Sequence, residues 1–419
     1  MANARPVRRR QRSGREWALR CVLAAAALLL CYLSMTRTAA FVLQKSNAEQ
    51  AYALAPHDGR IAARLAARLT TQNADARQRA RSDRIARQAL VDEPLAVQAL
   101  TTLGLNTLSR GDTNRARQFF THSDALSRRE LGTRLWLIDD AVARGDVPGA
   151  LRHYDIALRT ARAASDLLFP ILTAAVSHPA VIEPLADTLA ARPPWSLGFV
   201  SHLAHSSVTP KASADLFRRL SQRGISLPPE PQAVVVNALV DSGAVNEAWA
   251  YYQSFRPGGD RRRSRDPRFT ADLEAPSVFD WRPVMNDAGV TASIQSNRAG
   301  GLFDFAAPST VGGIVLQQFQ LLPPGRYRLQ GTSAGIEQTS RALPYWQLVC
   351  RDGRELGRVD LPASTENNGR FAGDITVNGV CPVQVLRLVA RPSSEIGGVT
   401  GQIKSVALVP AAGSTAGRR

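Results

Sequence analysis

The feature that most constrains the fold is a residue pattern that recurs at a 34-residue spacing. Gly111-Asp112 and Gly145-Asp146 are 34 positions apart, and Gly243 begins a third copy. Such a period predicts one antiparallel helix pair per repeat, with the glycine in a turn that needs a positive φ. Around each glycine lie an aliphatic residue eight positions earlier, an alanine five positions later and an aromatic residue nine positions later: Leu103, Ala116 and Phe120; Leu137, Ala150 and Tyr154; Val235, Ala248 and Tyr252.

This spacing resembles the tetratricopeptide repeat family. The resemblance implies a TPR-like α-solenoid over residues 46–256 that binds partner proteins, with roughly ten to twelve helices stacked on one another. The chain departs from the family pattern in places. Gly104 keeps the family's early glycine, whereas Ile138 and Val236 replace it in the other copies. Between about residues 165 and 230 the repeat is degenerate, although apolar helical runs continue.

An uncharged apolar run, residues 21–35, follows a leader that holds seven Arg and one Glu in its first 20 residues. A positive leader stays in the cytoplasm while the chain beyond the apolar run is exported. Arg20 and Arg37 enclose 16 residues, which make about 24 Å of helix. We therefore predict a cytoplasmic leader over 1–20, a single transmembrane signal anchor over 21–43, and an exported remainder.

A cleavable signal peptide is the alternative. Thr38-Ala39-Ala40 has the small residues that cleavage needs. However, Ala39–Leu43 continues the apolar run, and neither Pro nor Gly breaks it beforehand. The uncleaved anchor is the favoured interpretation.

The interpretation of the net charge and of the cysteines depends on this compartment. The formal net charge is +17, and a basic surface ordinarily suggests nucleic acid. Export argues against that partner and favours anionic lipid head groups or acidic glycans. Cys350 and Cys381 lie in or beside expected strands, where an oxidising compartment permits a disulfide; two buried thiols that never meet are the alternative. Cys21 and Cys31 lie in the apolar segment as small hydrophobic residues.

The composition and the apolar pattern of the sequence change after the repeats. Residues 257–271 are rich in Gly, Pro and Arg and predict an exposed interdomain linker, or else a docking strip for an acidic partner. Short alternating runs then predict an antiparallel β-sandwich or jelly roll over 272–410, followed by a disordered tail over 411–419. The expected strands are Val290–Ile294, Gly313–Phe319, Gly325–Gly331, Trp346–Cys350, Leu356–Leu361, Asp374–Val377, Gln384–Val389 and Gln402–Val409.

Three segments of this part, LEAPSVFDW, PGRYRLQG and VTGQIKSVALV, resemble carbohydrate-binding modules of the jelly-roll type. The whole arrangement resembles membrane-anchored tetratricopeptide proteins of proteobacteria. That resemblance implies a bacterial inner-membrane location with the bulk of the chain in the periplasm. It also implies a role beside exopolysaccharide or protein-export machinery.

We find no motif for catalysis, metal binding or a cofactor, and expect none of the three. His202 and His205 share a helix face but lack a third ligand. Glycan binding needs aromatic platforms with planar polar neighbours, although core packing is a strong alternative for these aromatic residues. The candidate platforms are Trp281, Tyr345 and Trp346, with Arg351, Asn367 and Asn368 as hydrogen-bonding partners.

The favoured function is a non-enzymatic adaptor that binds protein partners through its helical repeats. A glycan-binding protein that acts through its β-sandwich is the second hypothesis. A glycan-active enzyme is the third, and it would need paired carboxylates in a cleft.

Overall fold

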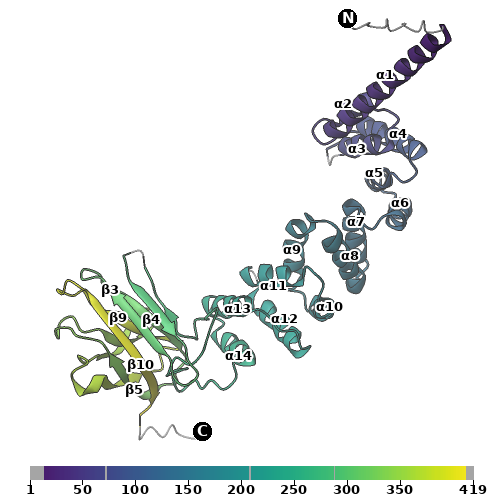
Figure 1. The fold of residues 1–419 in the computed structure, drawn as a ribbon. Helices are drawn as coiled ribbons and strands as arrows, with labels where there is room; N and C mark the ends of the chain where they lie inside the picture. The colour runs from purple at the N-terminus through teal and green to yellow at the C-terminus, as the bar shows by residue number, and fades with distance from the viewer. Residues whose placement is uncertain (1–13, 71–72, 207–208, 287, 412–419) are drawn as a thin grey trace, which may run out of the picture. The chain divides into compact units, whose positions relative to one another are not determined.

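A computed structural model describes residues 14–70, 73–206, 209–286 and 288–411 (Figure 1). These residues form fourteen α-helices, one short 3₁₀ helix and ten strands. The chain divides into two compact units, Met1–Leu168 and Phe169–Arg419, with the boundary inside a helix. The predictions for most of the leader and for the tail from residue 412 onward fall outside the described residues.

The first helix, α1 (Gly14–Leu43), is long and apolar enough to cross a bilayer. Almost all of its side chains are exposed, as a lipid-facing helix requires. Its last two turns are different. Ala40 is fully buried against Ala51, Ala55 and Ile61, which belong to the next two helices and the turn between them. The end of α1 is therefore part of the first unit's core.

The first unit continues as a run of antiparallel helix pairs. Consecutive helices contact each other from α1 through to α8. The helices are α2 (Ala48–Leu54), α3 (Gly59–Leu69), α4 (Ala76–Asp92), α5 (Val97–Leu108), α6 (Thr113–Leu126), α7 (Leu131–Ala143), α8 (Val147–Thr160) and the beginning of α9 (Ala164–Ala175). The second unit holds the rest of α9, α10 (Pro179–Ala190), α11 (Ser196–His205), α12 (Pro210–Gln222), α13 (Pro229–Asp241) and α14 (Val245–Phe255).

The recurring residues have the structural roles that their spacing predicts. Gly111, Gly145 and Gly243 turn between paired helices with φ of +85°, +72° and +81°. The alanines and aromatic residues of the pattern are buried in all three copies. Phe120 stacks on Trp136 with ring centroids 4.3 Å apart. Three helix pairs of the region, α5 with α6, α7 with α8 and α13 with α14, thus share a common turn.

The second unit ends in a sandwich of two antiparallel five-stranded sheets, with orders β1-β4-β9-β6-β7 and β2-β3-β10-β5-β8. One apolar core fills the space between them. The predicted fold class is confirmed. The strands are β1 (Arg282–Pro283), β2 (Thr291–Gln295), β3 (Leu302–Ala307), β4 (Gly313–Gln320), β5 (Gly325–Ala334), β6 (Tyr345–Cys350), β7 (Glu355–Asp360), β8 (Arg370–Val377), β9 (Gln384–Ala390) and β10 (Val399–Pro410).

All eight expected strands are present, and β1 and β3 are two that the sequence analysis missed. The disulfide between Cys350 and Cys381 is confirmed, with Cα atoms 5.6 Å apart. It joins the end of β6 to the segment that enters β9.

The segment expected to be an exposed linker is partly folded into the sandwich. Ser264, Arg265 and Phe269 are buried. Ser264 donates its backbone N–H to Leu408 and accepts the Leu408 N–H at its hydroxyl. Composition predicts exposure here, but these contacts bind the middle of the segment to the edge of β10.

Candidate functional site

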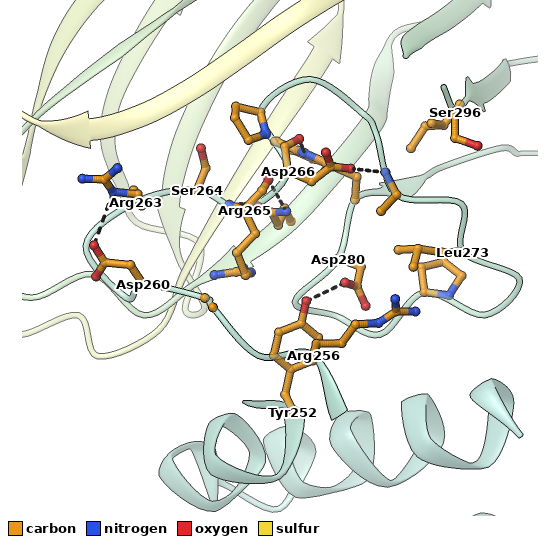
Figure 2. A pocket seen from close by; sticks show the side chains of 18 of the residues that line it. Tyr252, Arg256, Asp260, Arg263, Ser264, Arg265, Asp266, Leu273, Asp280 and Ser296 are labelled. Carbon is orange, nitrogen blue, oxygen red and sulfur yellow. Dashed lines mark hydrogen bonds and ion pairs between the residues drawn. The ribbon is translucent and has the colours of Figure 1, made fainter. Parts of the chain in front are cut away.

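A pocket of about 760 Å³ lies within the second unit, between the end of α14, the segment that follows it and the sandwich (Figure 2). Its polar lining comes mainly from residues 256–280, and its apolar lining includes Trp281, Ile294 and Val409. It combines this volume with several charged side chains and is therefore the candidate functional site.

Arg265 holds one wall of this pocket in place. It is 9% exposed, and its guanidinium donates to the carbonyl oxygens of Phe279, at 2.6 Å, and Phe319. The guanidinium also lies 5.2 Å from the ring centroid of Trp249 and 5.5 Å from that of Phe279. Burial lowers the pKa of Arg265 to about 10, so the residue stays charged at neutral pH.

Asp280 holds the opposite wall, and its carboxylate is saturated. Oδ1 accepts a 2.7 Å hydrogen bond from the Tyr252 phenol. Oδ2 accepts the backbone N–H of Ser277 at 2.9 Å and its hydroxyl at 2.7 Å. Burial, with a further contribution from Asp280, raises the pKa of Tyr252, so the phenol stays protonated and donates.

Asp266 is saturated in a similar way. Its carboxylate accepts the backbone N–H of Thr270 at 2.7 Å, the Thr270 hydroxyl at 2.9 Å and the backbone N–H of Ala271 at 3.1 Å. Its carbonyl accepts the indole N–H of Trp281 at 2.9 Å. These bonds fold the segment around the pocket and leave neither Asp266 nor Asp280 as a free acid or base.

The arginines that line the pocket differ in what they contact. Arg263 pairs with Asp260 at 3.3 Å, and Arg265 is bound as described. Arg256 is half-buried and, among the described residues, its side chain makes no hydrogen bond or ion pair. Among the same residues Arg265 forms no ion pair either and its Nη1 atom is without a hydrogen-bond partner, but it is buried, so Arg256 is the more accessible cation for an acidic or polar ligand. No group of three or more His, Cys, Asp or Glu that could hold a metal ion occurs in the described residues.

The three predicted aromatic platforms do not lie on one surface of the sandwich. Trp281 and Trp346 are 3% and 0% exposed, and their rings meet in the core with centroids 5.7 Å apart. This is the core packing that the sequence analysis weighed against ligand stacking, because a ring with no exposed face has nothing to offer a sugar. Tyr345 lies on the other face of β6, where Arg358 and Arg391 approach its ring at 4.1 Å and 4.7 Å.

The predicted polar partners lie in two further places. Arg351 donates to the carbonyl oxygen of Val240 at 2.6 Å and to the carboxylate of Asp241 at 3.0 Å, which ties the sandwich to the end of α13. Asn367 and Asn368 line a second, open hollow of about 660 Å³ on the outer surface of β10, β5 and β8. The structure does not bring these residues together with Trp281, Tyr345 or Trp346 into one site.

Sequence reasoning missed the pocket because its residues appear as a linker. One signal was available. Phe279 and Trp281 alternate with Asp280 directly after the basic segment, which places a carboxylate beside aromatic core residues.

Comparison with known proteins adds little to this geometry. No family model matches the chain, and no curated protein matches it. Among solved structures, it is similar to the enzymatically active domain of bacteriophage CBA120 tailspike protein 4, with 17% identity and a TM-score of 0.23, over 32% of this chain and 20% of that one. It is also similar to the Glycosylation Associate Protein (Gap123) complex from Streptococcus agalactiae, with 12% identity and a TM-score of 0.20, over 29% and 39%. The chain thus spans well under half the length of either structure, and at these TM-scores neither likeness carries a functional argument.

Proposed function

We propose that this protein is a non-enzymatic, membrane-anchored scaffold whose helical region binds partner proteins on the exported side of a bacterial inner membrane. The observation that carries the proposal is the packing of the end of α1 against the first helix pair, α2 and α3. Ala40 is fully buried against α2 and α3, so the apolar helix belongs to the fold. Partners bound to the helical region would be held close to the bilayer at high effective concentration.

The tetratricopeptide resemblance supports protein binding as the task of the helical region. Three pairs share the turn glycine, the buried alanine and the buried aromatic residue. Stacked pairs of this kind create extended surfaces that suit other proteins.

The packing of Ala40 also favours the uncleaved anchor. Cleavage after Ala40 would separate it from its contacts with Ala51 and Ile61 and would cut within a continuous helix. The residue that a signal peptidase would have to reach is thus inside the folded core.

The pocket supports binding more than chemistry. The carboxylates of Asp266 and Asp280 each accept three hydrogen bonds, whereas the Arg256 side chain is unpaired among the described residues. An acidic side chain of a partner is a suitable ligand for that guanidinium.

A topology experiment tests the proposal. We expect a periplasm-active reporter fused after Ala411 to be active, and the full-length product to stay in the membrane fraction after alkaline extraction. Site-specific photo-crosslinkers at the exposed apolar residues Leu105, Leu126 and Val142 should then yield discrete protein adducts, which the same probe at Thr400 on the sandwich should not. A cytosolic carboxyl end would contradict the proposal.

Glycan binding by the sandwich is a second candidate, favoured by the open hollow over β10, β5 and β8. Its floor includes Ala372 and Ala407, and its rim offers Asn367, Asn368 and Arg370. Phe371, the aromatic residue that lines it, is 6% exposed, so binding would depend on hydrogen bonds. Affinity electrophoresis in polysaccharide gels, comparing the native chain with Arg370→Ala, tests this idea, since an unchanged mobility for both chains would remove it.

A further inference from the structure

We propose that one face of α4 is a docking surface for anionic phospholipid head groups beside the membrane helix. The surface, here called the α4 stripe, consists of Arg77, Arg81, Arg84 and Gln88. The inference rests on the proposed anchorage by α1 and adds to it a lipid partner and the residues that contact that lipid.

The stripe follows from the helical period. Arg77, Arg81, Arg84 and Gln88 recur at intervals of four, three and four residues, so they share one face. All four side chains are exposed. A capping box between Asp75 and Gln78 fixes where α4 begins and therefore which face the arginines occupy.

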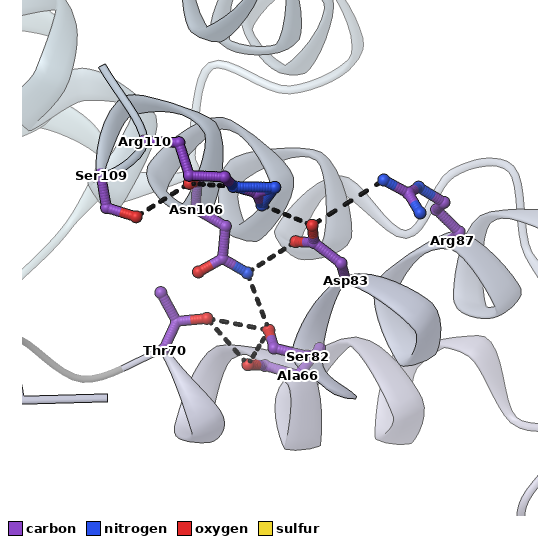
Figure 3. Close-up of polar contacts among 8 residues, drawn as sticks. All are labelled: Ala66, Thr70, Ser82, Asp83, Arg87, Asn106, Ser109 and Arg110. Carbon is purple, nitrogen blue, oxygen red and sulfur yellow. Dashed lines mark hydrogen bonds and ion pairs between the residues drawn. The ribbon is translucent and has the colours of Figure 1, made fainter. Parts of the chain in front are cut away.

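Asp83, the acidic residue in the middle of α4, points away from the stripe. Asp83 is 4% exposed and is held on the α5 side by Asn106 at 2.8 Å and Arg110 at 2.5 Å (Figure 3). Arg87 approaches the same carboxylate at 3.8 Å. Asp83 is thus paired inside the helix bundle. The stripe meets two other acids, since Glu49 pairs with Arg81 and Asp92 accepts a 2.9 Å hydrogen bond from Gln88, whereas Arg77 and Arg84 are left without an acidic partner in the described part of the chain.

Two contacts place the stripe at the membrane end of the unit. Arg81 pairs with Glu49 of α2 at 3.0 Å. Arg68, at the end of α3, donates to the backbone carbonyl of Lys45, two residues beyond the end of α1. Arg81 of the stripe therefore lies beside the first turn of α2, the helix that directly follows α1.

The charges of the stripe are available to a partner. The side chains of Arg77 and Arg84 make no hydrogen bond or ion pair with any described residue, and the Arg81 side chain is half exposed despite its contact with Glu49. Basic clusters directly outside a membrane helix attract anionic lipid surfaces, and the attraction fades within a Debye length. The side chains of Phe41 and Val42 are 70% and 69% exposed on the last turns of α1 and give the end of that helix an apolar surface.

Amide hydrogen exchange of the full chain in lipid nanodiscs tests the inference. With discs of phosphatidylcholine mixed equally with phosphatidylglycerol, we expect exchange across residues 76–92 to be on the order of tenfold slower than in pure phosphatidylcholine discs. High salt should abolish the difference. The triple variant R77Q/R81Q/R84Q should lose it. The matched variant R115Q/R128Q/R129Q, with the same change in charge on exposed arginines of the same unit, should keep it.

Equal exchange in the two kinds of disc, or the same loss in both triple variants, would overturn the inference. Slower exchange on adding soluble glycerol phosphate to neutral discs would show a free-phosphate site and would also overturn it. Far-UV circular dichroism checks that both variants fold. If the native chain leaves the discs altogether, the anchorage itself has failed, whereas a chain that stays in the discs without protection of α4 removes the lipid contact alone.

Discussion

The phenol of Tyr252, in the last helix, donates a 2.7 Å hydrogen bond to the carboxylate of Asp280, which lies just before the first strand. The adjacent Tyr251 is also buried, but its hydroxyl has no hydrogen-bond partner among the described residues. Two neighbouring tyrosines thus differ in whether their polar atom is satisfied, and this difference sets opposite expectations for the same substitution.

We expect Tyr252→Phe to destabilise the second unit by about 1–2 kcal/mol, because it removes a donor from a buried carboxylate. Tyr251→Phe should instead be neutral or stabilising by up to about 1 kcal/mol, because it removes a buried hydroxyl that is unsatisfied. Urea unfolding followed by tryptophan fluorescence measures both. Equal losses of unfolding free energy in the two variants would contradict the claim that Tyr252 donates a buried hydrogen bond and Tyr251 does not.

The same pair predicts a loss of stability in alkali. Burial raises the pKa of Tyr251 and of Tyr252 above the usual value of 10.0. The folded state therefore holds the phenolic protons that the unfolded chain releases above pH 10, and the stability they contribute, complete below that pH, declines as the pH rises further. Phenolate absorbance should show these two groups ionising together with unfolding. The variant Tyr251→Phe, which removes one of these groups without breaking the bond to Asp280, should shift the alkaline unfolding midpoint upward.

Two glycines of the repeat should respond to alanine for different reasons. A Cβ atom on Gly104 would lie 2.8 Å from the Phe120 ring, so Gly104→Ala should cost about 1–3 kcal/mol through overpacking. A Cβ on Gly111 would meet nothing within 4 Å, but φ is +85°, so Gly111→Ala should cost about 1 kcal/mol through backbone strain. A second substitution, Phe120→Leu, should relieve part of the Gly104→Ala loss and none of the Gly111→Ala loss, as double-mutant unfolding would show.

Removing the disulfide should destabilise the sandwich. The cysteines are separated by 31 residues, a loop whose closure contributes roughly 3–4 kcal/mol on the chain-entropy model. Cys350→Ser/Cys381→Ser should lower the denaturant midpoint accordingly, and reduction of the native protein should match it. Cys21→Ser/Cys31→Ser, which alters the two cysteines exposed on α1, is the control and should leave the midpoint unchanged.

Local patterns predicted most of the fold. The helix pairs follow from glycine, alanine and aromatic residues at fixed offsets, and eight strands follow from alternation between turn residues. Strand β3 was missed although Phe303 and Phe305 alternate around Asp304, because Gly300-Gly301 before it and Pro308 after it are typical of a loop. Strand β1 has two residues, too few for any periodic signal.

The candidate site was much less predictable. The burial of Arg265 depends on carbonyl oxygens of Phe279 and Phe319 and on the ring of Trp249. These groups are distant in sequence, and composition alone favours an exposed arginine. Likewise, alternation allowed either Tyr345 or its neighbour Trp346 to face outward, and only the packing of two sheets decides which.

The close packing around Ala40 has a mechanical consequence. The helix α1 contains no proline and no glycine after Gly14, so with α1 in the bilayer as proposed, nothing within the helix between the lipid and Ala40 can act as a hinge. When a membrane helix tilts to match the thickness of the surrounding lipid, the first helix pair must turn with it. Bilayer thickness thereby becomes a variable that sets the direction in which this pair points.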